Sequence, residues 1–141
     1  MTDIEHMGIG AMLHMLAGGS KHSAQEYVGR RIVSANIDDN RLNISFDDGT
    51  SIQIWDDGQS CCEYRHMSTD DDLQSIVGHK LLRIEAKPGP DPDEEEYEGV
   101  HETCFVEVGT DDGFITIVNH NEHNGYYGGF GLTITEPGED D

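Results

Sequence analysis

Alternating apolar and polar positions predict two β-hairpins in this chain. The first spans 41–54 and turns at Asp-Asp-Gly, residues 47–49. The second spans 104–118 and turns at a second Asp-Asp-Gly, residues 111–113. Alternation with period two is typical of half-buried strands, and Asp-Gly supplies the positive φ that tight hairpin turns require. Both segments are therefore expected to be antiparallel β-structure.

A weak internal repeat connects these hairpins. Val-Gly-Arg-Arg-Ile-Val at 28–33 is echoed 49 residues later by Val-Gly-His-Lys-Leu-Leu at 77–82. Each motif is expected to open a β unit, one covering 28–67 and the other 77–135. A further strand should follow each hairpin, over 63–67 and 130–135. The sequence thus predicts two related β units.

Helical signals lie outside the hairpins. Asp70-Asp71-Asp72 ahead of 73–77 predicts an N-capped short helix between the units. Residues 4–16 contain most of the methionines with apolar positions at helical spacing, which favours a helical arm within 1–27. The expected fold class is α+β and mostly antiparallel β, with a duplicated domain at 28–135 and an acidic tail at 136–141.

Charge is distributed unevenly along the chain. From Pro88 onward there are fifteen Asp and Glu and no Lys or Arg, so this segment carries −15 of the net charge of −21. The insertion at 88–102 holds three prolines and a run of carboxylates, and we expect a mobile, extended loop there. Such charge disfavours direct contact with nucleic acid or anionic membrane and favours a basic protein partner, although a high-salt host is an open explanation.

Eight carboxylates and two tyrosines are the candidate partner-binding residues. The acidic candidates are Asp91, Asp93, Glu94, Glu95, Glu96, Glu98, Asp111 and Asp112. The aromatic candidates, Tyr126 and Tyr127, lie in a glycine-rich segment without the lysine of a phosphate loop. We expect no cofactor. An N-terminus carrying acids and the absence of a long apolar run predict a cytoplasmic protein.

A metal-binding site is the most specific chemical alternative to a binding protein without a metal. Its candidate ligands are soft or imidazole groups with one carboxylate: Cys61, Cys62, His66, His120, Glu122 and His123. The spacing lacks Cys-x-x-Cys, so buried thiols with solvent-facing histidines are the competing interpretation. A nucleophilic Cys61 or Cys62 is disfavoured, because no neighbouring positive charge lowers a thiol pKa. An enzyme is therefore the less favoured class.

Several motifs together resemble a known family. The two Val-Gly motifs, Asp47-Asp48-Gly49, Cys61-Cys62-Glu63 and Asn124-Gly125-Tyr126-Tyr127 are similar to an uncharacterised domain family of bacteriophage and some bacterial proteins, over residues 28–135. The resemblance implies a phage or prophage setting and no established activity.

The favoured hypothesis is a non-enzymatic binding protein in the host cytoplasm. Its carboxylates would occupy the basic surface of a host nucleic-acid-handling protein as a nucleic-acid mimic or inhibitor. The alternative is a structural or assembly component of a virion, anchored by its N-terminal arm, which would also allow a homo-oligomer. A metal-binding protein or enzyme using the Cys and His loops comes third.

Overall fold

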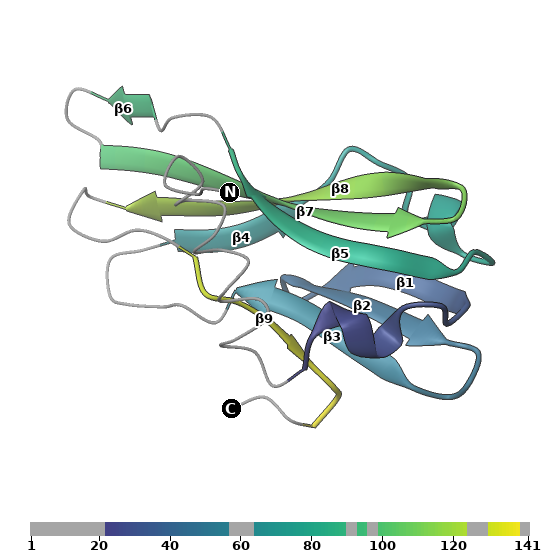
Figure 1. Cartoon of the computed structure of the whole chain (residues 1–141). Coiled ribbons are helices and arrows are strands. Elements are labelled where there is room, and N and C mark those ends of the chain that lie inside the picture. The colour runs from purple at the N-terminus through teal and green to yellow at the C-terminus, as the bar shows by residue number, and fades with distance from the viewer. Residues whose placement is uncertain (1–21, 57–63, 90–92, 96–98, 124–129, 139–141) are drawn as a thin grey trace, which may run out of the picture.

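Two antiparallel sheets pack face to face in this protein (Figure 1). The computed structural model describes residues 22–56, 64–89, 93–95, 99–123 and 130–138. The first sheet has the strand order β1-β2-β3-β9, with bounds Ile32–Asp38, Arg41–Phe46, Ser51–Asp56 and Leu132–Thr135. The second sheet has the order β4-β8-β7-β5, with bounds Tyr64–Ser68, Gly113–His123, Gly99–Thr110 and Leu81–Pro88. A short strand β6, Asp93–Glu95, pairs with the start of β7.

The core lies between the sheets and follows the alternation of the sequence. Every second residue of β2 is buried, and Ile52 and Ile54 of β3 are fully buried beside them. The second sheet contributes Val106 and Ile117, which are opposite each other on β7 and β8. Such alternation leaves one face of each sheet for solvent, as expected of an antiparallel sandwich.

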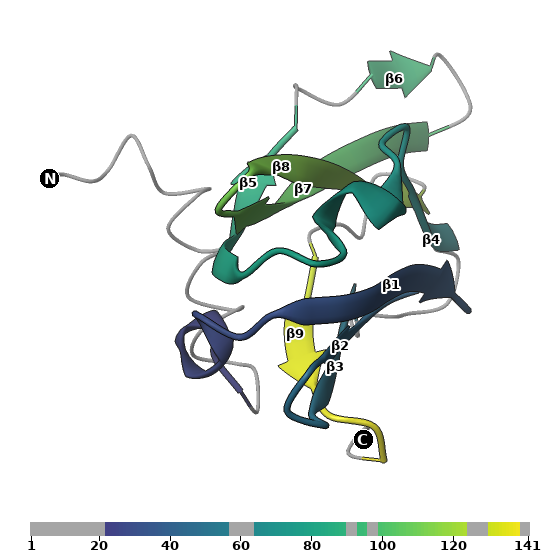
Figure 2. The same ribbon diagram turned by 90° about the vertical axis from the view of Figure 1, so that its right-hand side faces the viewer.

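The order of elements repeats along the chain. A short 3-10 helix, a strand, a hairpin and a fourth strand occur twice, as η2-β1-β2-β3-β4 and, with β6 inserted before β7, as η3-β5-β7-β8-β9. The fourth strands are exchanged: β4 pairs with β8 of the later set, and β9 pairs with β3 of the earlier set. In Figure 2, β9 accordingly runs beside β3 although it is the last strand in sequence. Each sheet thus contains strands from both halves of the chain.

Reciprocal hydrogen bonds join the two halves at the Val-Gly motifs. The Gly29 amide donates to the Leu81 carbonyl, and the Gly78 amide donates to the Ile32 carbonyl, each at 2.7 Å. Gly29 and Gly78 have φ of 93° and 94°, a region that residues with a Cβ rarely occupy. The same residue type in the same unusual conformation at both motifs gives this junction local two-fold symmetry.

The predicted hairpins are confirmed. Asp47-Asp48-Gly49 connects β2 to β3, and Asp111-Asp112 connects β7 to β8 where Thr110 is opposite Gly113. The expected strands after each hairpin are present as β4 and β9. The turns differ in length: residues 47–50 separate β2 from β3, where the Phe46 amide donates to the Thr50 carbonyl, and only 111–112 separate β7 from β8.

The expected mostly antiparallel β-structure is confirmed, but the described residues contain fewer and shorter helices than the α+β class implies. Among the described residues, the helices are two four-residue 3-10 turns, η2 at Ala24–Tyr27 and η3 at Leu73–Ile76. The expected helix between the units is η3, and the Asp72 carboxylate caps it by accepting from the Gln74 amide. Four residues are too few for an α-helix to stabilise itself. The predicted helical arm at 1–21 lies outside the described residues.

The prediction of an extended loop over 88–102 is also wrong for part of this segment, because 93–95 and 99–102 lie in strands. Asp93, Glu94 and Glu95 pair with His101, Val100 and Gly99, so part of the insertion is a β-hairpin. Cross-strand backbone bonds override the low β-propensity of Asp and Glu here, since that propensity depends strongly on context. We call the segment 93–101 the acidic hairpin.

Candidate functional site

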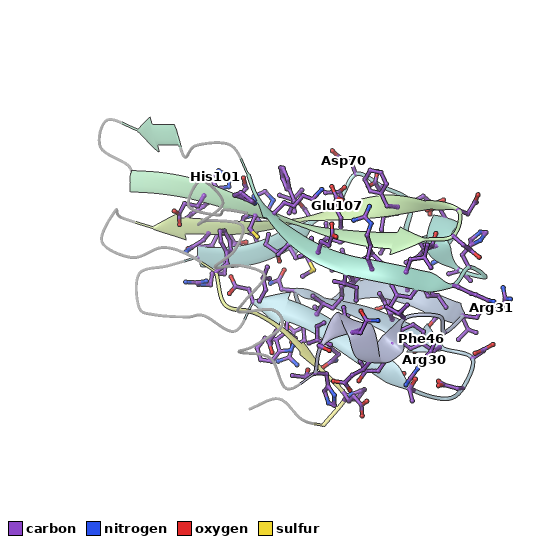
Figure 3. All side chains as sticks on the ribbon, viewed as in Figure 1. Arg30, Arg31, Phe46, Asp70, His101 and Glu107 are labelled. Atoms are coloured by element: carbon purple, nitrogen blue, oxygen red, sulfur yellow. The ribbon has the colours of Figure 1, made fainter. Side chains whose placement is uncertain are left out.

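The outer face of the second sheet brings three histidines together. His66 of β4 lies directly opposite His120 of β8, and His120 is opposite Thr103 of β7. His101 is two residues from Thr103 and therefore diagonal to His120 on the same face. Figure 3 shows His101 on the outer side of β7, at the end nearer to β6. We call His66, His101 and His120 the histidine cluster.

The three rings are in close contact. The rings of His66 and His120 stack with centroids 4.2 Å apart and planes 1° from parallel. His101 Nε2 lies 2.9 Å from His120 Nδ1, a hydrogen bond in which either nitrogen can be the donor. One ring nitrogen from each histidine lies within 4.8 Å of the other two. Three nitrogen donors thus converge on one small volume.

Neighbouring polar groups orient these rings. Ser68 Oγ lies 2.8 Å from His120 Nε2, and Glu122 Oε2 lies 3.2 Å from His66 Nε2. Burial lowers the pKa of His120, and the adjacent His66 and His101 lower it further. A lowered pKa keeps the His120 imidazole neutral near pH 7, with a lone pair available on one nitrogen.

Two of these histidines were predicted from the sequence, and the third was not. His66 and His120 were candidate ligands, whereas His101 lies in the segment that was expected to be a loop. The turn at Asp111-Asp112 could have revealed His101. Extending the antiparallel pairing outward from this turn places His101 opposite Glu122, and therefore two residues from the position opposite His120. His123 pairs with Val100 at the end of β8, and its side chain lies outside the described residues.

The acidic candidates fall into two separate regions. Asp93, Glu94 and Glu95 form β6, which stands clear of the sandwich in Figures 1 and 2. Asp111 and Asp112 lie at the opposite end of β7, about 30 Å away at the rise of an extended strand. They face His79, whose Nδ1 and Nε2 lie 3.3 and 3.5 Å from the two carboxylates. The described acidic candidates are therefore not one continuous surface.

The remaining candidates lie outside the described residues. They are Asp91, Glu96, Glu98, Cys61, Cys62, Tyr126 and Tyr127. The third cysteine, Cys104, is buried in β7, and burial raises its thiol pKa to about 12. Cys104 is therefore a core residue and no nucleophile.

A small polar pocket adjoins the histidine cluster. It has a volume of about 210 Å³ and shares His66 with the cluster. Its other lining residues are Asp39, Asn40, Arg41, Trp55, Asp56 and Arg65. The Arg41 guanidinium stacks 3.9 Å above the Trp55 ring, and Arg65 donates to Asp56 at 2.7 Å. The cations that line the pocket are thus engaged by protein groups.

Comparison with known proteins identifies the family. A model described as a domain of unknown function, DUF7448, matches residues 25–131. The chain belongs to the DUF7448 family. The DUF7448 match runs from η2 through β8 and ends at Gly131, directly before β9. No curated protein and no solved structure matches the chain.

The described part of the chain also contains no helix that is long and apolar enough to span a membrane.

Proposed function

We propose that this protein is a non-enzymatic, acidic binding protein of phage or prophage origin. Its acidic hairpin would occupy the basic surface of a host protein that handles nucleic acid. The observation that carries the proposal is the charge of −15 on residues 88–141, from which the acidic hairpin is built. A dense negative field attracts basic surfaces and accelerates encounter with them.

The position of the acidic hairpin supports this role. The basic strand that pairs with β7 is β5, whose Lys87 is opposite Phe105, four residues or about 13 Å along β7 from His101. Lys87 and Arg83 instead contact Glu107, at 3.1 and 3.0 Å. Burial opposes ionisation of Glu107, yet hydrogen bonds from these two cations lower its pKa. Among the described side chains, the cations of β5 thus compensate Glu107 and Glu85.

The spacing of the carboxylates fits imitation of a phosphate backbone. Asp93, Glu94 and Glu95 are consecutive residues of a strand, which advances about 3.3 Å per residue. Phosphates of one DNA strand advance about 3.4 Å per step along the helix axis. Counted over both faces of the strand, consecutive carboxylates therefore have a similar charge per unit length, whereas the carboxylates on one face are two residues, or about 6.6 Å, apart.

The test is capture of a basic partner from host lysate at low and high salt. In one variant, Asp93, Glu94, Glu95, Glu96 and Glu98 are changed to Asn and Gln. At roughly 0.2–1 kcal/mol for each exposed ion pair, we expect affinity to fall by about 5-fold to 5,000-fold at low salt. Captured protein should also release bound DNA or RNA when the wild-type chain is added.

A matched control removes the same number of charges elsewhere. Asp38, Asp39, Asp47, Asp70 and Asp72 are all exposed, and their change to Asn preserves the cap of η3. This variant should retain most of the affinity. If deletion of residues 1–19 abolishes capture while the neutralised hairpin does not, the proposal is wrong and the virion-assembly alternative takes its place.

A further inference from the structure

We propose that the histidine cluster is a binding site for a divalent transition-metal ion, with zinc the best fit. His66, His101 and His120 would be its protein ligands, and a water molecule its fourth. This site differs from the sequence hypothesis, because it uses His101 and needs neither Cys61 nor Cys62. It does not depend on the proposed binding of a basic partner.

The distances between the ring nitrogens fit a tetrahedral ion. With bonds of about 2.0–2.1 Å, two nitrogens on a tetrahedral zinc are about 3.3 Å apart. His101 Nε2 and His120 Nδ1 are already 2.9 Å apart, joined by a hydrogen bond with one proton between them. Replacing that proton by a cation requires the two atoms to separate by only about 0.4 Å. The third nitrogen, from His66, starts within 4.8 Å of the other two. Because the His66 ring is stacked parallel to His120, it has to tilt out of that stack to ligate the ion, pivoting about its contact with Glu122.

The hydrogen bonds around the cluster prepare the ligands. When His120 binds metal through Nδ1, its Nε2 carries the proton and donates to Ser68 Oγ, 2.8 Å away. Glu122 accepts from His66 Nε2 and holds that ring on the surface of the sheet. A hydroxyl or carboxylate behind a ligating histidine fixes the tautomer and raises the basicity of the ring. Each of these rings therefore has a partner of the kind that metal-binding histidines use.

The charge of the chain and the donor set also favour a transition-metal cation at this position. A net charge of −21 on the chain adds a long-range attraction for cations. Three imidazoles without thiolate suit Zn²⁺, Ni²⁺, Co²⁺ and Cu²⁺, and disfavour Mg²⁺ and Ca²⁺, which prefer oxygen ligands.

The binding test uses the full-length, tag-free chain. Zinc chloride is titrated into it by calorimetry near neutral pH, and Co²⁺ serves as a visible-absorption probe of tetrahedral nitrogen ligation. We expect one equivalent of zinc to bind with a micromolar or lower Kd. His120→Ala and His101→Ala should each raise Kd more than the roughly 10- to 100-fold typical of losing an outer hydrogen-bond partner. Ser68→Ala should raise Kd within that range.

The matched control is His79→Gln. His79 is also a partly exposed histidine beside two carboxylates, but it lies outside the histidine cluster. This variant should bind zinc as the wild type does, and circular dichroism should show that all variants fold. An unmetallated surface cluster is the conclusion if zinc binds weakly or without defined stoichiometry. The proposal also fails if Cys61→Ser/Cys62→Ser abolishes binding while His101→Ala and His120→Ala do not.

Discussion

The buried ion pair between Asp56 and Arg65 offers a sharp test of how the two sheets are held together. Asp56 ends β3 of the first sheet, and Arg65 lies in β4 of the second sheet. Each side chain is only 9% exposed, and Arg65 Nη1 donates to Asp56 Oδ2 at 2.7 Å. The Gly131 amide, just before β9, donates to Asp56 Oδ1 at 2.8 Å. One carboxylate therefore links the segments at which both exchanged strands begin.

The perturbation is Arg65→Met, which keeps much of the volume and removes the charge. It leaves the Asp56 carboxylate buried without its cation, which costs about 3–5 kcal/mol in comparable pairs. A domain of this size has a total stability of about 5–15 kcal/mol, so the loss is a large fraction of it. Adding Asp56→Asn removes the stranded charge and keeps an acceptor for Gly131. The double variant should therefore be more stable than Arg65→Met alone.

The assay is urea unfolding followed by fluorescence of Trp55, the single tryptophan, which lines the pocket beside this ion pair. Arg30→Met is the control, because Arg30 and its partner Asp48 are 33% and 44% exposed. It should cost at most about 1 kcal/mol. The reasoning is refuted if Arg65→Met costs no more than this control, or if the effects of Arg65→Met and Asp56→Asn simply add.

Two further predictions concern the Val-Gly motifs and the histidine cluster. Gly29→Ala and Gly78→Ala should each destabilise by about 1–2 kcal/mol, because a Cβ there meets no atom within 4 Å and the whole cost is backbone strain at positive φ. Markedly unequal losses in urea unfolding would contradict the local two-fold symmetry. The pKa of His120, followed by NMR titration without metal, should lie below the ordinary value of 6.5 and rise in His101→Ala, which removes a charged neighbour. Because folding lowers this pKa, His120 contributes stability above about pH 6.5 that is lost as pH falls toward the folded-state pKa. A His120 pKa at or above 6.5 would show that the packing of the rings differs from that described.

The hairpins could be predicted from sequence because their signals are local. Residues 41–54 and 104–118 carry both the alternation and the turn residues that specify a hairpin. The signal for the short helix after Asp72 is equally local. The helix has only four residues before its C-cap at Val77, and it is a 3-10 turn.

The exchange of β4 and β9 could not be predicted, because alternation shows which face of a strand is buried and not which strand lies beside it. The pairing of Asp56 with Leu132 joins positions 76 residues apart (132 − 56). His101 was missed for a related reason: its neighbours are set by the register of β7 with β8, and the carboxylates and prolines before it predicted a loop.

The strand exchange has a consequence for how the chain folds. The first sheet is incomplete until Leu132–Thr135 has been synthesised and has paired with β3. A nascent chain that lacks this segment therefore has an unpaired edge on β3. Pairings this distant in sequence make the contact order high, which slows folding to roughly milliseconds to seconds. The two halves should consequently form a single cooperative unit, and a fragment ending before Leu132 should fold neither half independently and should aggregate through that edge.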